Sequence, residues 1–377
     1  MTVALEVPLE APTISTSPKD PVNRQILEVS EDQIKGFSPN PMAEIAKRAN
    51  LPVETVIDRI QAMLRSGVVR RVRQTLLATN LAQGALVAWK IGFDKLDAAF
   101  EFIAKEDPFS GHVVIRNTET GVNEWPLWTT LKVPTGFSVD AHLEFIRKKI
   151  GAEKFRIMPA LRAFVLGVGH MRRKNMAVGE KADKPAMDMV PAIVNLNERE
   201  WQVLVELKRD FTADEISENL WAPRAKAAGV PLDEFLAIAK SLDQRGVIGR
   251  FSTFLEHTKP VGDASERLSS FNGLFHWAVP KGKEIEAGRE IGRFAILTHA
   301  YWRDAGPELN DVNIMAVAHG ETKEQVMAHK AAIDQFLVDS GIGLNYTNVY
   351  WGGRAEIKPS EISPRAYREW AEKYGVI

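Results

Sequence analysis

The chain has 377 residues, 45% hydrophobic and 26% charged, which is ordinary for a soluble globular protein of more than one domain. Lys and Arg number 48 against 49 Asp and Glu, so no overall positive charge indicates nucleic-acid binding. The absence of cysteine excludes disulfides, thiolate metal sites, iron–sulfur ligation and a cysteine nucleophile. No segment approaches the roughly 18 apolar residues of a membrane span, and the N-terminus lacks a signal-peptide pattern, so we expect a cytoplasmic protein.

The first segments of the chain predict an arm and a small helical domain. Residues 1–22 are rich in Pro, Thr and Ser and are expected to form a disordered arm. Residues 23–80 contain a short helix over 41–50 and a second helix over 51–64, with Pro52 in its first turn, followed by a strand. This order predicts a winged helix-turn-helix. The alternative is a helical domain used only for packing or dimerisation.

Residues 81–168 alternate strands and helices in the order β-α-β-β-α-β, with the last strand expected over 155–165. The order predicts a ferredoxin-like domain, in which two helices cover one face of an antiparallel sheet. The other face is left for a partner or a ligand. Residues 169–192 have the composition of a polar linker.

The second half repeats this organisation. Residues 193–255 predict a second winged helix-turn-helix, and residues 256–355 a second ferredoxin-like domain that opens with a polar insertion over 256–267. The helices of the first of these are expected over 196–207, 212–220 and 231–244. Residues 356–377 form an amphipathic tail helix whose Trp370 is expected to pack on a neighbouring surface. The predicted class is therefore α+β, built as a tandem duplication.

A pair of polar residues recurs in both predicted sheets. His112 and Arg116 in the first half correspond to His299 and Arg303 in the second, at an offset of 187 residues for both members. Residues four apart on a strand share one face, so each His lies beside its Arg. An imidazole and a guanidinium on one face suit proton transfer and anion binding. A single such pair would favour a solvated surface, whereas its repetition favours a functional site.

The predicted architecture resembles the Lrp/AsnC proteins, and several motifs resemble one enzymatic branch, the siroheme decarboxylases. The likeness covers roughly residues 25–355, and some members of that branch fuse two such units. The segments that carry it are Val87-Ala-Trp89 and Trp277-Ala-Val-Pro280, Ser110-Gly-His-Val-Val-Ile-Arg116 and Thr298-His-Ala-Tyr-Trp-Arg303, Trp125-Pro-Leu-Trp-Thr129, and Asn313-Ile-Met-Ala-Val-Ala-His-Gly320. Arg162-Ala-Phe164 and Arg354 hold the place of a terminal family motif but lack its lysines.

The resemblance implies a reaction and a set of roles. Its substrate would be siroheme, an iron tetrapyrrole with eight carboxylates that loses CO₂ from two acetate arms in haem or haem-like cofactor synthesis. Catalytic proton donors would be His112 and His299, and Arg116 and Arg303 would hold carboxylates, which guanidinium binds bidentately. Further substrate-binding residues would be Trp125, Trp128, Arg162, Trp302 and His319, and the walls of the ring site could also include Trp89 and Trp277.

The other histidines are weaker candidates. His276 stands where the first half has Ala88 and so marks a difference between the copies. Four histidines are expected to be solvated: His142, His170, His257 and His329. No cysteine and no clustered His spacing is present, so we expect no dedicated metal site and no cofactor beyond the tetrapyrrole substrate and its haem-like product.

Two other functions stay open. A DNA-binding regulator is favoured by the basic run Arg65, Arg70, Arg71 and Arg73, but the second helix of the second motif is acidic, so DNA is an improbable partner. A tetrapyrrole-binding protein without chemistry is the third reading. The expected partners are the tetrapyrrole and, within the chain, the other repeat in an internal pseudo-dimer, with a further homodimer as an option and no membrane contact.

Overall fold

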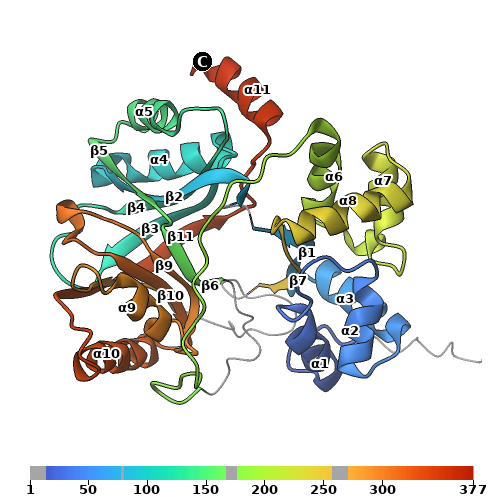
Figure 1. Cartoon of the computed structure of the whole chain (residues 1–377), viewed down its shortest axis with the longest axis horizontal. Coiled ribbons are helices and arrows are strands. Elements are labelled where there is room, and N and C mark those ends of the chain that lie inside the picture. The colour runs from blue at the N-terminus through green and yellow to red at the C-terminus, as the bar shows by residue number, and fades with distance from the viewer. Residues whose placement is uncertain (1–13, 78–79, 167–175, 257–270, 377) are drawn as a thin grey trace, which may run out of the picture.

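The structure, a computed structural model, describes residues 14–77, 80–166, 176–256 and 271–376. Its helices and strands form a mixed α/β fold of two bodies that lie side by side, one mainly helical and one built around a large sheet (Figure 1). Among the described residues, no helix is long and apolar enough to cross a membrane.

The helical body combines elements from both halves of the chain. The first half supplies α1 (Pro21–Ser30), α2 (Pro41–Ala49), α3 (Val53–Arg65) and strand β1 (Val69–Leu76). The second half supplies α6 (Glu198–Lys208), α7 (Trp221–Ala227), α8 (Leu232–Gln244) and strand β7 (Ile248–Leu255). The strands β1 and β7 pair antiparallel into a two-stranded ribbon, and one hydrophobic core runs through both sets of helices. The two halves are therefore joined here by a shared core.

Local signals explain most of these helix boundaries. The side chain of Asn40 accepts a hydrogen bond from the backbone of Ala43 to cap α2, and Asn50 ends that helix in the left-handed conformation. The helix expected over 212–220 is wrong. A 3₁₀ turn occupies Ala213–Glu215, and α7 starts only at Trp221, because Pro223 is tolerated in a first turn but not further into a helix.

The disordered arm expected over residues 1–22 is wrong for residues 14–22. Its residues 1–13 lie outside the described part of the chain, but the residues after them contact the helical body. The Asn23 side chain donates to the carbonyls of Ser15 and Ser17, and Asp20 caps α1. The helix consequently begins at Pro21.

The sheet body contains two similar successions of elements. The first comprises β2 (Ala82–Lys90), α4 (Phe93–Glu106), β3 (Ser110–Thr118), β4 (Leu127–Pro134), α5 (Val139–Ile150), β5 (Lys154–Pro159) and β6 (Arg162–Leu166). The second comprises β8 (Phe271–Ala278), α9 (Glu284–Ile291), β9 (Leu297–Trp302), β10 (Ile314–Gly320), α10 (Lys323–Asp339) and β11 (Tyr346–Ile357). The insertion expected over 256–267 lies, apart from Glu256, outside the described residues.

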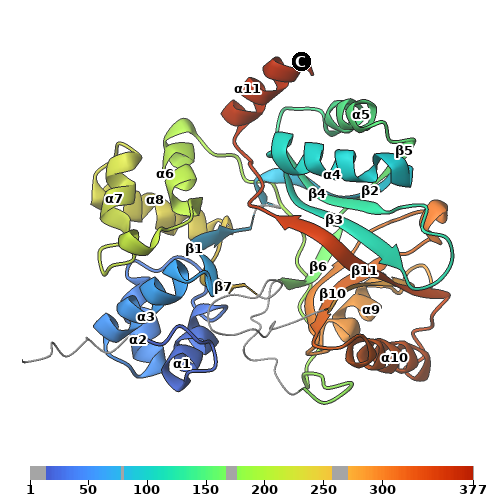
Figure 2. The ribbon, with the colours of Figure 1, turned by 180° about the vertical axis from the view of Figure 1, so that it is seen from behind.

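All these strands belong to one antiparallel sheet of nine strands in the order β5-β2-β4-β3-β11-β8-β10-β9-β6. Strand β11 pairs with β8 of its own half and then with β3 of the other half (Figure 2). In the same way β5 pairs with β2, while β6 pairs with β9 of the second half. The single strand expected over 155–165 is therefore two strands. Pro159 ends the first, since it has no N–H with which to continue the ladder.

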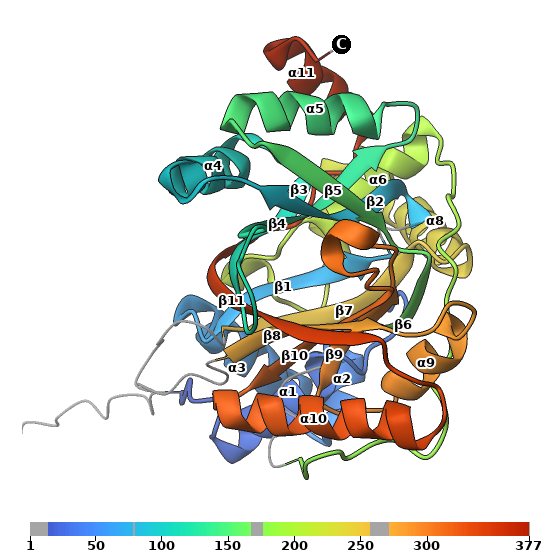
Figure 3. The same ribbon diagram turned by 90° about the vertical axis from the view of Figure 1, so that its left-hand side faces the viewer.

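Helices cover one face of this sheet at both ends. In Figure 3, α4 and α5 lie over the first half, α9 and α10 lie over the second, and the strands run between them. Each pair of helices packs on its own core, which contains Trp89 in the first half and Trp277 in the second. The inward faces of the two halves meet in a further small core around Trp128, Met315 and Tyr350.

The tail helix α11 (Pro364–Tyr374) packs on the first half, where Tyr367 and Trp370 join the core beneath α4 and α5. This contact corrects one expectation, because His142 is fully buried rather than solvated. Its ring stacks on Trp370 at 4.7 Å between centroids, and its Nε2 lies 3.4 Å from Asp107 Oδ2.

His329 is likewise buried rather than solvated, and its Nδ1 accepts a hydrogen bond from the backbone N–H of Gly179 at 3.4 Å. The physical reason is that residues 176–192 of the expected linker pack beside the second half instead of crossing solvent. Lys181 forms a bridge with Phe294 on the way. The other two histidines expected to be solvated, His170 and His257, lie outside the described residues.

Candidate functional site

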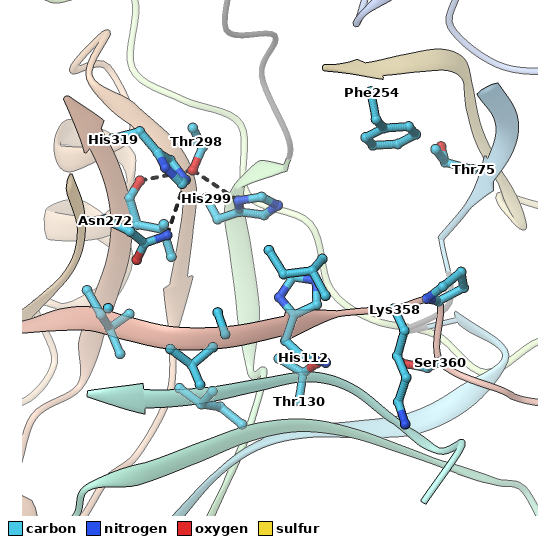
Figure 4. Close-up of a pocket in the computed structure, with 18 of the residues that line it drawn as sticks. Thr75, His112, Thr130, Phe254, Asn272, Thr298, His299, His319, Lys358 and Ser360 are labelled. Atoms are coloured by element: carbon cyan, nitrogen blue, oxygen red, sulfur yellow. Dashed lines mark hydrogen bonds between the residues drawn. The ribbon is translucent and has the colours of Figure 1, made fainter. Parts of the chain in front are cut away.

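A cavity of about 700 Å³ lies between the inward face of the large sheet and the β1–β7 ribbon. Figure 4 shows His112 and His299 reaching into it from the sheet, with Thr75 and Phe254 of the ribbon on the far side. Its volume is in the usual range for small-molecule sites, which are clefts of roughly 300–1,000 Å³. Both halves of the chain and both bodies contribute walls.

Strand alternation brings the first His/Arg pair to this cavity, as the sequence predicted. His112, Val114 and Arg116 are alternate residues of β3, and all three line the cavity. The backbone N–H of His112 donates to Thr130 Oγ1 on the neighbouring strand at 3.0 Å. The imidazole itself is exposed to the cavity. Enclosure by the protein walls, followed by the charges of Arg70, Arg116 and Arg71, lowers the pKa of His112 to about 4.

Arg116 is almost completely buried, with 7% of its surface exposed. Its Nη1 donates to the side-chain oxygen of Asn272 and to the carbonyl of Tyr350, both at 3.2 Å. The amide nitrogen of Asn272 lies 3.5 Å from Nε2 of His319. Burial lowers the pKa of Arg116 to about 10, which leaves it charged at neutral pH. We call Arg116, Asn272, His319 and the Tyr350 carbonyl the Asn272 corner.

The second pair is arranged similarly. His299, Tyr301 and Arg303, on and just after β9, line the cavity. Nδ1 of His299 lies 3.1 Å from Thr298 Oγ1. Arg303 is 8% exposed, and its Nη1 donates to the carbonyl of Met158 at 2.5 Å. The guanidinium also lies over the ring of Tyr301, 4.5 Å from its centroid, and burial lowers its pKa to about 10.

The two arginines hold equivalent positions. Tyr350 pairs with Leu274 of β8, and Met158 pairs with Leu86 of β2, which is the repeat counterpart of Leu274. Each guanidinium thus reaches across to a strand of the opposite half and bonds a carbonyl at the same register. The His/Arg pairs that recur in the sequence therefore also make equivalent contacts in the structure.

Arginines of the ribbon form the opposite wall of the cavity. In the sequence, three of these arginines belong to a basic run that favoured DNA binding. Arg70, Arg71, Arg73 and Arg250 all line the cavity. Arg71 donates to the carbonyl of Ile357 at 2.6 Å, and Arg73 lies 3.5 Å from Asp210. The basic run was visible in the sequence but favoured contact with DNA there. Whether these arginine side chains face the cavity or solvent depends on how the ribbon packs against the sheet. The sequence of the basic run does not determine that packing.

Other predicted residues divide between the cavity and the cores. Trp128 and His319 line the cavity, together with apolar Leu274 and Met315. Trp302 is not among the cavity residues of the described chain, because it alternates with Tyr301 and Arg303 and packs against the second-half core instead.

Arg162 and Trp125 are also placed elsewhere. Arg162 begins β6 at the register of Trp302 and lies 3.7 Å from Asp188 of the linker. Trp125 is buried in the core between the two halves, and its carbonyl accepts a hydrogen bond from the indole N–H of Trp128. In this structure Trp125 and Trp302 pack in the cores and Arg162 lies beside Asp188, so none of the three is among the cavity residues of the described chain. The substrate-binding roles expected of them stay predictions.

Buried His276 lies beside this cavity wall. Its ring contacts Trp128 and Tyr350 at centroid distances of 5.6 and 4.8 Å. Burial, then the charges of Arg116 and Lys330, lower its pKa to about 3, so it is neutral. Within the described residues, no group of three or more His, Asp or Glu side chains is arranged to hold a metal ion.

Comparison with known proteins bears on this arrangement. Residues 81–164 match the AsnC-like ligand binding domain. A siroheme decarboxylase of Hydrogenobacter thermophilus is 23% identical over 288 residues, which are 76% of this chain and 80% of the relative. The siroheme decarboxylase alpha subunit of Desulfovibrio desulfuricans is 28% identical over 154 residues, 40% of this chain and 82% of that subunit. The predicted resemblance to siroheme decarboxylases is confirmed.

The fold is shared with solved structures as well. The crystal structure of the siroheme decarboxylase NirDL in complex with an iron-uroporphyrin III analogue aligns with a TM-score of 0.65 at 18% identity. The alignment covers 93% of this chain and 99% of that chain. The crystal structure of NirDL alone gives the same TM-score at 19% identity.

Proposed function

We propose that the protein is a siroheme decarboxylase-like enzyme that removes CO₂ from acetate side chains of an iron tetrapyrrole. One observation carries the proposal: a single cavity contains both His/Arg pairs, four further arginines of the ribbon and an apolar wall around Trp128 and Met315. A flat macrocycle with carboxylates on its rim needs this combination of apolar surface and cations.

The buried guanidiniums provide the binding step. Arg116 and Arg303 each use one nitrogen on a backbone carbonyl, which fixes their planes and leaves other N–H groups for carboxylates. Because these arginines are already desolvated, an anionic partner gains strongly from meeting them. The same positions hold the acetate and propionate arms so that one acetate is presented to an imidazole.

The chemical step requires a proton. The bond between the acetate methylene and the carboxylate carbon breaks, CO₂ leaves, and the electron pair remains on the methylene carbon, which takes a proton to become a methyl group. His112 is neutral in the empty cavity because its pKa is about 4. Burial is the main cause of this low pKa, and the charges of Arg70, Arg116 and Arg71 are the smaller causes. Bound carboxylates neutralise those charges and so favour the protonated imidazole, which is the proton donor of this step.

We also propose that the chain is a tandem duplication of a winged helix-turn-helix and a ferredoxin-like domain, with boundaries near 23–80, 81–168, 193–255 and 256–355. The equivalent hydrogen bonds from Arg116 to the Tyr350 carbonyl and from Arg303 to the Met158 carbonyl support this assignment, as do the strand pairs β11–β3 and β6–β9 between the halves. The arrangement corresponds to an internal pseudo-dimer, because each half completes the cavity corner of the other.

The arrangement of the basic run argues against the alternative function of a DNA-binding regulator. Arg70, Arg71 and Arg73 line the cavity, and Arg65 pairs with Asp214 at 2.8 Å. The first turn of α8 carries Asp233 and Glu234, which would repel phosphates.

The experiment is incubation of the purified protein with siroheme, with the product analysed by mass spectrometry. The proposed function predicts successive losses of one and then two CO₂. A tetrapyrrole-binding protein without chemistry would change the visible spectrum of siroheme and leave its mass unaltered. That outcome would overturn the enzymatic assignment.

A further inference from the structure

The repeat extends to two further positions that the His/Arg pairs did not reveal. Lys132 and His319 stand 187 residues apart, the same offset as the pairs, and Gly84 and Asn272 stand 188 apart, the offset of Leu86 and Leu274. The structure keeps these correspondences, since Lys132 pairs with Gly84 between β4 and β2, and His319 pairs with Asn272 between β10 and β8. At these two equivalent places the backbones match and the side chains differ. Asn272 and His319 line the cavity, whereas Gly84 and Lys132 lie two residues along their strands from the lining residues Leu86 and Thr130.

At the Asn272 corner the polar groups bond to each other. Asn272 accepts from Arg116 through its oxygen, and its nitrogen lies at hydrogen-bond distance from His319. A neutral amide thus fills the space between a cation and an imidazole. This corner has a protein partner for its guanidinium before any ligand arrives.

The equivalent corner contains Arg303, Lys132, Gly84 and the Met158 carbonyl, and we call it the Lys132 corner. Gly84 has no side chain, and the ammonium of Lys132 lies over it so closely that a Cβ at this position would collide with Nζ. Among the described residues, the structure gives Lys132 Nζ no hydrogen-bond or ion-pair partner, and it gives Arg303 one, the Met158 carbonyl.

Among the described residues, Arg303 and Lys132 therefore lie in this corner without a carboxylate bonded to either. Lys132 is on the same face of β4 as Trp128 and Thr130, which line the cavity, and Arg303 lines it directly. Burial, and then the charge of Arg303, lower the pKa of Lys132 to about 7. Desolvated like charges are unfavourable unless an anion joins them, so the corner is built to accept one.

We propose that Lys132 and Arg303, one from each half of the chain, together bind one carboxylate arm of the substrate, as a site separate from the Asn272 corner. The proposal rests on the proposed function for the identity of the substrate, but its chemistry requires only an anionic arm reaching this end of the cavity. Lys132 supplies a point charge and Arg303 a planar pair of donors, which suit the two oxygens of a carboxylate.

Binding of iron uroporphyrin III, which carries eight carboxylates, tests the proposal through the change in its visible spectrum. Lys132→Met removes the charge at similar volume and is expected to weaken binding by on the order of tenfold or more, as for a lost charged hydrogen bond. Lys132→Arg restores a cation and is expected to stay within about threefold of the wild type. Lys148→Met, which changes an exposed lysine of α5, is the matched control and leaves binding unchanged.

Iron coproporphyrin III, in which methyl groups replace the acetates, identifies the arm. If Lys132→Met weakens binding of both porphyrins, the corner holds a propionate; if it weakens only the uroporphyrin, the corner holds an acetate. Either result supports the site.

A folded Lys132→Met protein, checked by circular dichroism and thermal melting, that binds both porphyrins as tightly as the wild type overturns it. Failure of the proposed function looks different, because the wild type then binds iron uroporphyrin III but leaves the mass of siroheme unchanged. A wild type that binds neither porphyrin overturns both.

Discussion

The Asn272 corner and the Lys132 corner have the same backbone plan and different polar side chains beside their arginines. In the first, Arg116 already bonds an amide; in the second, Gly84 holds the position of that amide and Lys132 lies over it. A symmetric pair of subunits carries the same residues at both ends of such a cavity. A fused chain can differ at each end, and siroheme, whose acetates and propionates are not equivalent, presents different arms to each. If the two corners bind different arms, the difference between them would fix the orientation of the proposed substrate.

The largest expected effect concerns the two imidazoles. His112→Ala and His299→Ala should each lower the rate of CO₂ loss by about 10²-fold, the usual size for a lost general acid. The measurement is the rate at which each decarboxylated product appears by mass. Lys148→Ala, at an exposed position of α5 that does not line the cavity, is the control.

The pattern among the histidine variants sharpens the comparison of the two ends. If His112→Ala blocks both losses of CO₂ and His299→Ala blocks neither, the second half is a scaffold. If each variant stops at a different singly decarboxylated product, each end handles one acetate. Wild-type rates in both variants would show that these are ordinary sheet residues.

The next effect in size is expected for the arginines. Arg116→Lys and Arg303→Lys should each weaken binding of iron uroporphyrin III by about tenfold, because an ammonium cannot bond a backbone carbonyl and both carboxylate oxygens as the guanidinium fork does. The loss should be greater for Arg303, since in the Arg116 variant Asn272 and His319 remain as polar partners for the ligand. Equal losses at the two positions would contradict the difference between the corners.

The sequence predicted those features that depend on local pattern. The His/Arg pairs line one cavity because strand alternation places residues four apart on the same face, and the recurrence of the pair was visible as a constant offset. The same rule, applied to neighbouring positions, would have excluded Trp302, which follows Tyr301 and precedes Arg303 and so faces the helices. The prediction for Trp302 treated the motif as a set of side chains and did not assign each residue to a face of the strand.

Features that depend on contacts between distant segments could not be predicted from local sequence patterns. The arginines of the ribbon could line a cavity or face solvent, and only the contact between the helical body and the sheet decides. The exchange of β6 into the second half and the burial of His142 under α11 likewise follow from contacts between segments far apart in the chain. Lys132 gave no motif, and only its pairing with Gly84 identifies it as the counterpart of His319.

The smallest expected effect comes from making the two corners alike. Gly84→Asn places at the Lys132 corner the amide that its counterpart has at position 272. The backbone of Gly84 is an ordinary strand conformation, and the atoms that the new side chain meets are the flexible end of Lys132, so the strand should accept it. The amide oxygen would then accept from Lys132 or Arg303 and compete with a carboxylate. Because a carboxylate would have to displace this one hydrogen bond, we expect iron uroporphyrin III to bind about threefold more weakly. Gly84→Ala, which adds bulk without an acceptor, separates this competition from steric displacement of Lys132. If the Asn and Ala variants lose the same affinity, the amide has no electrostatic role, and the difference between the corners is one of space alone.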